Sequence, residues 1–523
     1  MTTENCPSVV FIGFMGAGKT TALATLREKG LWETVDTDEL LAGELGISIS
    51  EAFDRDGEEA FRAREEEVVL RTLGEADRWA VALGGGSVLS ERVREALREH
   101  TVVWLQVDAD TAWERVAGGD RPLAQDRRAF DALFAERTPI YESLADAILP
   151  GCSPEDIAFA ATHLFRLDAF PGARLLWASS ASGAYPVFVG KSLLRTSGAA
   201  SLSDEYWWPL PGERCCVTDA TVGPLYADRL APLAATVEVP VGESAKTMGE
   251  AERVLREMAR LGVTREDHVI ALGGGVVGDL AGFCAHVYQR GIPVVQVPTT
   301  LVAQVDSAYG GKTGVDLPEG KNYAGAYHLP AAVIADTSTL ATLPGEELAA
   351  GFVEALKTGL LAGGALWERV RAIESLDPAD LDDVVFACAR YKCEVVAADE
   401  RDAGLRQVLN LGHTVGHAIE AASGYGRYRH GEAIGLGLLA ALRLSDAPAL
   451  RGEVEEVLRR HGLPISLDSA IELEPTLAAL ERDKKRTAAG VGFVLLSEPG
   501  APRAGEPVDP AKVRAAVEEL YPS

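Results

Sequence analysis

The N-terminal region contains a glycine-rich segment that ends in a lysine and a threonine. Residues Gly13–Thr20 read GFMGAGKT and fit the pattern G-x-x-x-x-G-K-[ST]. They follow an apolar run, Val9–Ile12, and precede a helical stretch, Thr21–Lys29. In such a strand–loop–helix unit, backbone N–H groups surround phosphate oxygens, the lysine reaches the β- and γ-phosphates, and the threonine ligates Mg²⁺. The segment therefore predicts a nucleoside triphosphate site that uses Lys19 and Thr20.

Two carboxylates follow the next apolar segment. Asp36-Thr37-Asp38 comes directly after Thr34-Val35, where a strand is expected to end. Carboxylates at that place can serve Mg²⁺ and a substrate hydroxyl group. A D-x-D pattern on its own is more often a helix N-cap, so it does not define the phosphate acceptor.

Side chains that bind metals recur in the C-terminal third of the chain. Three of the nine histidines, His413, His417 and His430, fall within 18 residues, and Glu354 precedes them. His413 and His417 are four residues apart and therefore share one face of a helix. A single histidine there would more often be a core residue, but two histidines and a glutamate are the ligands of a catalytic zinc site with open positions. The pattern favours a metal site.

A second glycine-rich segment lies between the two regions above. Residues 271–279 read ALGGGVVGD, follow the apolar run His268–Leu272 and open a helical stretch, as in a dinucleotide pyrophosphate loop. Polar loop residues come after the later strand-like runs, among them Lys312 and Lys321. Two lysines beside loops rich in hydrogen-bond acceptors indicate that this region recognises an anion.

The elements that must position these residues follow from the pattern of apolar runs. From Val9 to about Arg166, short apolar runs alternate with polar-faced helical stretches, which is typical of a parallel α/β sheet. Strand-like runs resume at Arg174–Ser180. After about Asp336, long amphipathic stretches such as Gly345–Leu361 predominate and predict helices.

The chain is long enough for two or three domains. We predict an α/β protein in which a P-loop NTPase domain, with a parallel sheet and helices on both faces, is fused to an α/β dinucleotide-binding domain and a mostly helical metal-binding domain. The predicted boundaries are 1–166 for the P-loop domain, 167–173 for a linker, 174–335 for the dinucleotide-binding domain and 336–523 for the helical domain.

Further motifs follow the P-loop in a fixed order. They are Phe53, Asp56-Gly57-Glu58, Phe61-Arg62, Glu65-Glu66-Glu67, Leu83-Gly84-Gly85-Gly86, Arg121-Pro122-Leu123 and Arg137-x-Pro139-x-Tyr141. This ordered set resembles shikimate kinase across essentially the first 165 residues. By itself Arg62 would also suit an exposed helix face opposite the acidic run Glu65–Glu67.

The kinase resemblance implies the roles of several residues. Asp38 would orient the shikimate 3-hydroxyl and accept its proton, and Arg62, Gly85 and Arg137 would bind the substrate. Arg121 would close over ATP as part of a mobile lid. ATP with Mg²⁺ would be bound by Gly16, Ala17, Gly18, Lys19, Thr20, Thr21 and Arg121, with Lys19 and Arg121 catalytic and Thr20 the Mg²⁺ ligand.

The C-terminal motifs have the order N-x-G-H-x-x-G-H, from Asn410 to His417, and then H-G-E from His430. This order resembles 3-dehydroquinate synthase over roughly residues 174–515. The resemblance implies Zn²⁺ or Co²⁺ held by Glu354, His413 and His430, with Lys357, Lys392 and His417 catalytic and His417 near the substrate phosphate. It implies substrate contacts from Arg290, Asp306, Asn322, Lys392, Arg406, Asn410, Lys484 and Lys485, with Arg290 reaching a neighbouring subunit, and hence a homodimer built through the synthase half.

The same resemblance implies bound NAD⁺. In that family NAD⁺ transiently oxidises a ring hydroxyl of 3-deoxy-D-arabino-heptulosonate 7-phosphate, phosphate leaves, and 3-dehydroquinate forms without net consumption of NAD. Thr221 stands where relatives usually have an asparagine. The NAD contacts would come from Asp219, Glu243, Ser244, Ala245, Lys246, Gly275, Val276, Val277, Gly278, Asp279, Thr299, Thr300, Lys312, Lys321, Thr339, Leu340, Ala341 and Thr342.

The composition limits the partners of the chain. Fifty basic and 78 acidic residues give a formal charge of −28, which disfavours nucleic acid and anionic membranes, and no apolar run could span a membrane. The first residues are acidic where a secretory signal would be basic. We therefore expect a cytoplasmic enzyme of small-molecule substrates, with positive charge concentrated in its binding sites.

Two other interpretations remain open. The second half could be a different sugar-phosphate cyclase or a metal-dependent polyol dehydrogenase, although a neutral polyol would not need the basic residues Lys312, Lys392 and Arg406. One half could also have lost its activity and act as a nucleotide-binding regulator. The presence of Lys19 and Asp38 in the first half, and of the complete zinc set in the second, argues against that.

Overall fold

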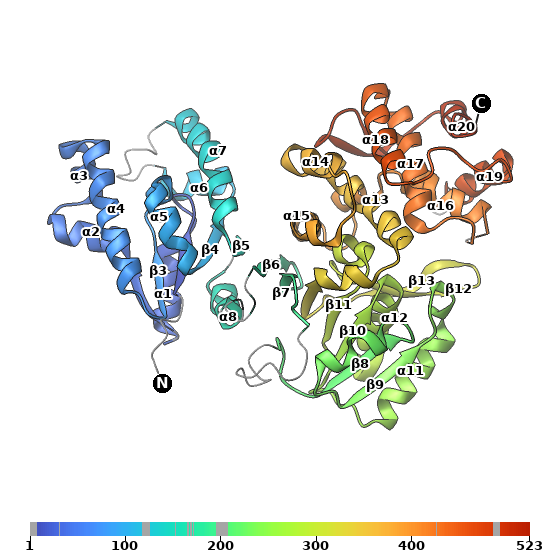
Figure 1. The fold of residues 1–523 in the computed structure, drawn as a ribbon, viewed down its shortest axis with the longest axis horizontal. Helices are drawn as coiled ribbons and strands as arrows, with labels where there is room; N and C mark the ends of the chain where they lie inside the picture. Colours follow the sequence, from blue (N-terminus) through green and yellow to red (C-terminus); the bar gives the residue numbers. More distant parts are fainter. Residues whose placement is uncertain are drawn as a thin grey trace. The chain divides into compact units, whose positions relative to one another are not determined.

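A computed structural model describes residues 8–30, 32–117, 126–151, 153–164, 167, 170, 172–194, 208–424, 426–484 and 492–522. The chain forms two compact units. The first contains the chain up to Ser179 and Ala184–Phe188; the second contains Ser180–Gly183 and the chain from Leu210 onward among its segments. The first unit is blue to cyan in Figure 1, and most of the second is green to red.

The first unit is built on a parallel sheet. Its strands lie in the order β2 (Glu33–Asp36), β3 (Trp79–Ala82), β1 (Val9–Ile12), β4 (Thr101–Gln106) and β5 (Ala147–Pro150), followed by β6 (Arg174–Ser180) and β7 (Gly183–Gly190). Strand β6 continues the parallel pairing on β5, with Ala147 opposite Leu175. The helices are α1 (Lys19–Glu28), α2 (Thr37–Leu45), α3 (Ile49–Asp56), α4 (Glu58–Glu75), α5 (Glu91–Ala96), α6 (Ala109–Val116), α7 (Arg127–Leu144) and α8 (Pro154–Leu164).

The second unit begins with another parallel sheet. Its strands lie in the order β14 (Ala332–Asp336), β11 (Val294–Pro298), β10 (His268–Gly273), β8 (Arg214–Asp219) and β9 (Ala235–Val239). The helices in this part are α10 (Gly223–Tyr226), α11 (Met248–Arg260) and α12 (Gly275–Val287). A separate antiparallel hairpin, β12 (Lys312–Leu317) and β13 (Gly320–Tyr327), occupies a region that the sequence pattern presented only as polar loops.

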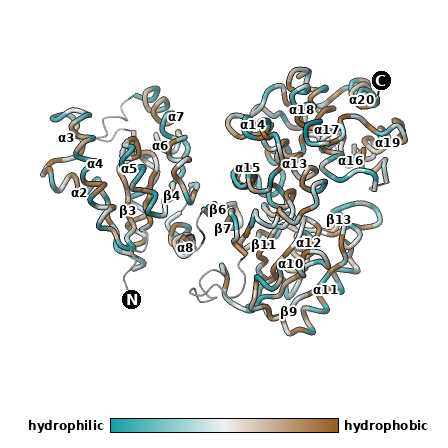
Figure 2. The backbone as a smooth tube through the Cα atoms, in the orientation of Figure 1, coloured by the Kyte–Doolittle hydropathy of each residue, from teal (hydrophilic) through white to brown (hydrophobic). Residues whose placement is uncertain are grey.

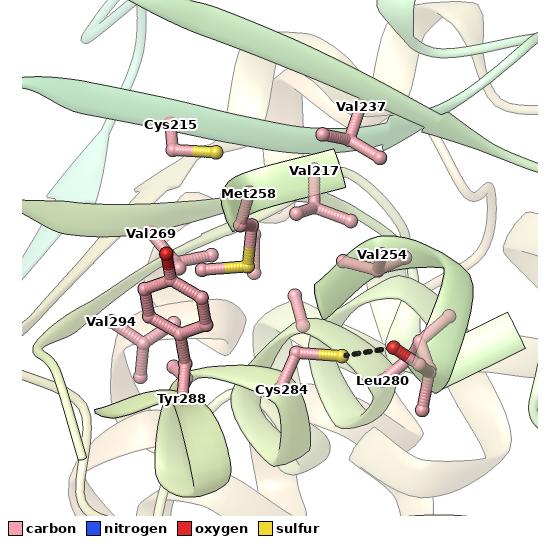
Figure 3. Packing of buried hydrophobic residues seen from close by; sticks show 14 of the residues in the cluster. Cys215, Val217, Val237, Val254, Met258, Val269, Leu280, Cys284, Tyr288 and Val294 are labelled. Carbon is pink, nitrogen blue, oxygen red and sulfur yellow. Dashed lines mark hydrogen bonds between the residues drawn. The ribbon is translucent and has the colours of Figure 1, made fainter. Parts of the chain in front are cut away.

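The core of this α/β part forms between the strands and the helices α11 and α12. Val217, Val254, Met258, Val269 and Leu280 are among its buried residues, and Figure 3 shows their side chains packed together. Teal and brown alternate along α11 in Figure 2, as expected for a helix with one apolar face. The core fixes the strand ends that carry the polar residues.

The remainder of the second unit is mostly helical. It contains α13 (Gly345–Ala362), α14 (Gly364–Arg371), α15 (Asp382–Ala398), α16 (His413–Ala422), α17 (His430–Leu444), α18 (Pro448–Arg460), α19 (Leu473–Lys484) and α20 (Pro510–Glu518), with the hairpin β15 (Phe493–Leu496) and β16 (Pro502–Glu506). Figure 1 shows these helices in yellow to red. The helix predicted over Gly345–Leu361 is confirmed to within one residue.

Glycines allow three of these helices to approach closely. A Cβ atom on Gly431 of α17 would lie 1.8 Å from the carbonyl oxygen of Ala350 on α13. One on Gly437 would lie 2.0 Å from the carbonyl oxygen of Gly412, at the start of α16. The glycines beside the histidines therefore bring α13, α16 and α17 together.

The predicted α/β fold class is confirmed, with a P-loop domain followed by a dinucleotide-binding-type sheet and a mostly helical region. The boundaries 1–166, 167–173, 174–335 and 336–523 stay predictions. No helix in the described ranges is long and apolar enough to span a membrane.

Candidate active sites

The P-loop of the first unit joins β1 to α1 in a tightly packed turn. Gly13 and Gly16 have φ angles of +150° and +81°, and a Cβ on Gly13 would lie 2.7 Å from the carbonyl oxygen of Leu105. Lys19 Nζ donates hydrogen bonds to the carbonyl oxygens of Gly13, at 2.7 Å, and Phe14, at 3.2 Å. The lysine is thus held over the loop whose backbone would bind phosphate.

The two aspartates after β2 have different positions. Asp36 caps α2, since one of its carboxylate oxygens accepts the backbone N–H of Asp38 at 3.0 Å. Its other oxygen accepts the hydroxyl of Thr20 at 3.0 Å, so Asp36 also joins the P-loop. The Asp38 carboxylate lies beside Gly84, where it would be 2.6 Å from an added Cβ. The capping interpretation is thus confirmed for Asp36, which also contacts the P-loop, and the role of Asp38 stays a prediction.

The segment Gly84–Gly86 gathers the predicted acceptor-binding residues. A Cβ on Gly86 would lie 2.1 Å from the Arg62 guanidinium, and Arg137 Nη1 donates to the Gly85 carbonyl at 3.4 Å. Arg137 is 3% exposed, and its Nε has no hydrogen-bond partner within the described part of the chain. A buried arginine with a free donor is suited to bind an anion such as a carboxylate.

Three further residues that contact the P-loop or the predicted acceptor-binding residues were not predicted to be functional. Glu65 is 5% exposed and accepts a hydrogen bond from Arg62 Nη1 at 2.7 Å. Tyr141 donates to the Gly85 carbonyl at 2.6 Å, and burial raises the pKa of its hydroxyl to about 12. Arg115 donates to the Gly16 carbonyl at 2.9 Å. The (i, i+3) spacing of Arg62 and Glu65 could have indicated their ion pair, whereas the sequence gives no sign of the Arg115 contact.

Glu354, His413 and His430 meet where α13, α16 and α17 pack together. Their ligand atoms lie within 4.8 Å of one another. Glu354 Oε1 is 3.3 Å from His430 Nε2 and 3.6 Å from His413 Nε2. The Glu354 side chain is 1% exposed, and neither of its oxygens accepts a hydrogen bond of ordinary geometry from a described residue. Such a buried carboxylate fits a cation, and the predicted metal ligands do converge.

The charges around Glu354 favour its ionised form. Burial alone would raise the pKa of its carboxyl, but Lys357 and His413 outweigh burial and hold the pKa well below its usual range. Burial and Lys357 hold the pKa of His413 well below its usual range, which leaves a neutral imidazole. Burial would lower the pKa of His430, but the neighbouring carboxylates of Glu354 and Glu420 raise it to about 10.

Buried basic side chains lie next to this cluster. Lys357 Nζ is 2.5 Å from Glu354 Oε2, and Lys392 Nζ donates to Asp306 Oδ1 at 2.5 Å. Burial would raise the pKa of Asp306, but Lys392 and Lys357 lower it to about 2. Three cationic groups, those of Lys357, Lys392 and Arg406, are each 8% exposed or less. These three buried cationic groups are suited to bind an anion.

Arg406 is positioned by the loop that precedes it. Its Nη1 donates to the carbonyl oxygens of Glu400, at 2.6 Å, and Gly310, at 3.2 Å. The Glu400 carboxylate accepts the backbone N–H of Ser182 at 2.9 Å, and Asp399 accepts the Arg406 N–H at 3.0 Å. The sequence pattern did not indicate these supporting contacts.

The dinucleotide-like loop connects β10 to α12. Gly274 lies at the N-cap of α12, and a Cβ there would lie 2.9 Å from Thr300, so the predicted loop and Thr300 are adjacent. Lys246 is 4% exposed and donates to Asp279 Oδ2 at 2.6 Å and to the side chain of Asn322. The structure therefore brings together residues from three predicted loops at the start of this helix.

The other predicted dinucleotide contacts lie around the same sheet edge. Asp219, at the end of β8, accepts the backbone N–H groups of Thr221 and Val222 at 2.8 and 2.9 Å. The hydroxyl groups of Thr342 and Tyr226 are 2.7 Å apart. The predicted residues Glu243, Ser244 and Ala245 form a short 3-10 helix, and Thr339, Leu340, Ala341 and Thr342 belong to another.

The remaining predicted residues have other surroundings. Lys312 pairs with Asp402, which was not predicted, whereas Lys321 Nζ is 3.4 Å from Oε1 of Glu243, another predicted dinucleotide contact. Asn410 and Arg290 are exposed, and Arg290 has a positive φ of +73°. The roles predicted for Arg121, for Lys485 and for the side chain of Lys484 lie outside the described residues.

Comparison with known proteins assigns both parts of the chain. Residues 15–162 match the family model of shikimate kinase. Residues 236–350 match the model of the N-terminal part of 3-dehydroquinate synthase, and residues 351–486 match the model of its C-terminal part. The 3-dehydroquinate synthase of Symbiobacterium thermophilum is 42% identical over 355 residues, which cover 64% of this chain and 98% of that protein. The 3-dehydroquinate synthase of Geobacter metallireducens is 45% identical over 298 residues, which cover 53% of this chain and 82% of that protein.

Two solved synthase structures have a similar fold. A 2-deoxy-scyllo-inosose synthase complexed with carbaglucose-6-phosphate, NAD⁺ and Co²⁺ is 25% identical, with a TM-score of 0.58, over 66% of this chain and 99% of that one. A 2-epi-5-epi-valiolone synthase from Streptomyces hygroscopicus with NAD⁺ and Zn²⁺ bound is 29% identical, with a TM-score of 0.55, over 64% of this chain and 96% of its own.

The fold and the sites define two classes of enzyme: a P-loop phosphotransferase, and an α/β enzyme with a glycine-rich loop at the start of a helix and a candidate metal site among helices. The chain belongs to the 3-dehydroquinate synthase family and carries a shikimate kinase domain in front of it. It is thus a bifunctional enzyme of the shikimate pathway, with a kinase (phosphotransferase) and a synthase (lyase) in one polypeptide.

Proposed function

We propose that the first unit transfers the γ-phosphoryl group of ATP to the 3-hydroxyl of shikimate, and that the second converts 3-deoxy-D-arabino-heptulosonate 7-phosphate to 3-dehydroquinate and phosphate. The observation that carries the second assignment is the convergence of the buried Glu354 carboxylate with His413 and His430, whose ligand atoms all lie within 4.8 Å of one another. The buried cations beside it fit a substrate that is both a phosphate ester and a carboxylate.

In the kinase, the backbone of Gly16–Thr20 and the ammonium group of Lys19 would hold the ATP phosphates, and Thr20 would ligate Mg²⁺ with support from Asp36. Asp38, beside the glycine segment, would orient the shikimate hydroxyl and accept its proton. Arg137 and Arg62 would bind the shikimate carboxylate. We also assign a lid role to Arg121.

In the synthase, Glu354, His413 and His430 would hold Zn²⁺ or Co²⁺. The loop at the start of α12 fits the NAD⁺ pyrophosphate, because a helix N-terminus offers free N–H groups and the glycines leave room for close approach. When bound, the metal and NAD⁺ supply the Lewis acid and the reversible hydride acceptor that make phosphate elimination possible.

The buried basic residues of the synthase site would bind the substrate. Lys357, Lys392 and Arg406 would fix the substrate by its anionic groups, and Asp306 keeps the Lys392 ammonium group in place. His417, which is exposed near His413 and His430, would face the phosphate that leaves. Asn410, Asn322 and one of Lys484 and Lys485 would complete the substrate contacts.

The assembly and the setting of the enzyme are also part of the proposal. We infer a homodimer in which exposed Arg290 reaches the site of the neighbouring subunit. Given the strongly acidic chain, we expect small-molecule substrates rather than nucleic acid, and a cytoplasmic location.

The reaction of the second unit can be tested by its stoichiometry. Purified protein is supplied with the heptulosonate phosphate, Zn²⁺ and a small amount of NAD⁺, while phosphate and absorbance at the NADH wavelength are followed together. We expect many equivalents of phosphate per NAD⁺ and no accumulation of NADH. Accumulation of NADH with a neutral polyol, without phosphate release, would instead identify a dehydrogenase. A parallel assay with ATP and shikimate should release ADP.

A further inference from the structure

The two nitrogen atoms of His430 face two different carboxylates. Nε2 lies 3.3 Å from Glu354 Oε1, on the side of the candidate metal site. Nδ1 lies 3.4 Å from Glu420 Oε1 in hydrogen-bond geometry. Whichever nitrogen carries the proton determines which one can ligate a metal, because a neutral imidazole has one donor and one acceptor.

Glu420 is placed by the same helix that carries the other histidines. His413, His417 and Glu420 are spaced i, i+4 and i+7 on α16 and therefore share one face. The Glu420 side chain is 7% exposed, which is unusual for a glutamate without a specific partner. Its partner here is His430, on the facing helix α17.

The other metal-site histidine is held in a comparable way. His413 Nδ1 lies 3.2 Å from the backbone carbonyl oxygen of Leu411, and His413 Nε2 faces Glu354. Both histidines therefore have an acceptor at Nδ1 and the shared carboxylate at Nε2. A metal-binding histidine commonly donates its outer N–H to such an acceptor, which fixes the tautomer and the ring orientation.

We propose that Glu420 is a positioning residue of the synthase: its carboxylate accepts the Nδ1–H of His430 and so presents Nε2 of that ring to the metal. The inference rests on the proposed metal site and extends it to a residue that does not touch the metal. The effect of Glu420 should appear first in metal affinity, and in turnover only when the metal is limiting.

A competing arrangement uses the same residues differently. His417, Glu420 and His430 also have ligand atoms within 4.8 Å of one another and could form a second cation site. That site would require His430 to serve two cations through one imidazole. Glu420 would then be a ligand itself, and the protein would bind two metal ions per chain at saturation.

The test uses full-length protein, freed of metal with a chelator, and measures zinc affinity by competition with a coloured indicator. The variants are Glu420→Gln, which keeps an acceptor of the same shape, and Glu420→Ala, which removes it. Glu432→Gln is the matched control, because Glu432 lies near His430 in sequence but accepts its hydrogen bond from the backbone of Arg429. Co²⁺ absorption spectra report the geometry of the ligand set.

We expect one zinc per chain in all proteins, with affinity reduced about 10- to 100-fold in Glu420→Ala, less in Glu420→Gln, and unchanged in Glu432→Gln. The Co²⁺ spectrum of Glu420→Ala should shift, and excess zinc should restore synthase turnover.

Two results would overturn the inference. The first is wild-type zinc affinity together with an unchanged Co²⁺ spectrum in both Glu420 variants. The second is binding of two zinc ions per chain by the wild type and of one by the variants, which would make Glu420 a metal ligand. If the wild type itself bound no zinc, the proposed function of the second unit would fail, which is a separate outcome. If Glu420→Ala does not fold, Glu420→Leu replaces it, because leucine fills a similar volume without an acceptor, and wild-type affinity and spectrum in that variant would refute the positioning role.

Discussion

The close contact between α17 and α13 at Gly431 predicts that a larger residue at this position disturbs the proposed metal site. Gly431 adjoins His430, and Ala350 lies one helical turn before Glu354, so this contact joins the helices of two proposed metal ligands directly. In Gly431→Ala the new Cβ would lie 1.8 Å from the Ala350 carbonyl oxygen, whereas ordinary contacts begin at 3.4 Å. The helices would have to separate by about 1.6 Å, the difference between these distances.

That separation is large compared with what a metal site tolerates. Catalytic and metal constellations must be held within about 0.5 Å of the productive geometry. We therefore expect Gly431→Ala to weaken zinc binding by at least about tenfold, to abolish synthase turnover at limiting zinc, and to cost roughly 1–3 kcal/mol of unfolding free energy in the second unit. Shikimate phosphorylation should not change, because the P-loop lies in the first unit.

Zinc competition, both enzyme assays and thermal unfolding measure these effects. The control is Gly452→Ala on α18, where an added Cβ has no atom within 4 Å. It should keep wild-type zinc affinity and stabilise the helix by up to about 1 kcal/mol. Wild-type zinc affinity and turnover in Gly431→Ala would refute the claim that this close contact sets the metal geometry.

Two further predictions concern the buried charges. Lys392 holds the pKa of the Asp306 carboxyl at about 2, below the usual 3.8. Ionised Asp306 therefore stabilises the folded state above about pH 4, and this contribution to the unfolding free energy is lost as the pH falls toward 2. Asp306→Asn should thus lower the unfolding free energy by roughly 2 kcal/mol at neutral pH and by little near pH 2; a pH-independent difference in urea titrations would contradict this. Glu65→Gln should free the Arg62 guanidinium and raise the KM for shikimate at least about tenfold without changing the KM for ATP. The control Glu66→Gln should leave both constants unchanged, and equal effects of the two substitutions would argue against a specific role for Glu65.

Much of the fold could be predicted because the signals are local. Apolar runs followed by glycine loops define strand ends, and the four-residue spacing of His413 and His417 defines a helix face. The structure confirms both features. The hairpin β12–β13 was not predicted, since its short strands contain glycines and lysines and have no regular apolar alternation.

The supporting residues of the sites were harder to predict. Glu420, Glu400 and Arg115 make contacts that depend on how helices and loops pack, and a single acidic or basic residue on a helix is usually solvated. Glu354 was assigned through family resemblance, because its distance along the chain from the histidines contains no periodic signal. Its convergence with them depends on the close helix contacts at Gly431 and Gly437.

The central claim is that one chain carries two independent active sites. The most direct measurement is a crossed assay of Asp38→Asn and His413→Ala, each tested for shikimate phosphorylation and for phosphate release from the heptulosonate phosphate. We predict that Asp38→Asn loses the first activity and keeps the second, and that His413→Ala does the reverse. Loss of both activities in either correctly folded variant, or retention of both in either variant, would contradict the account.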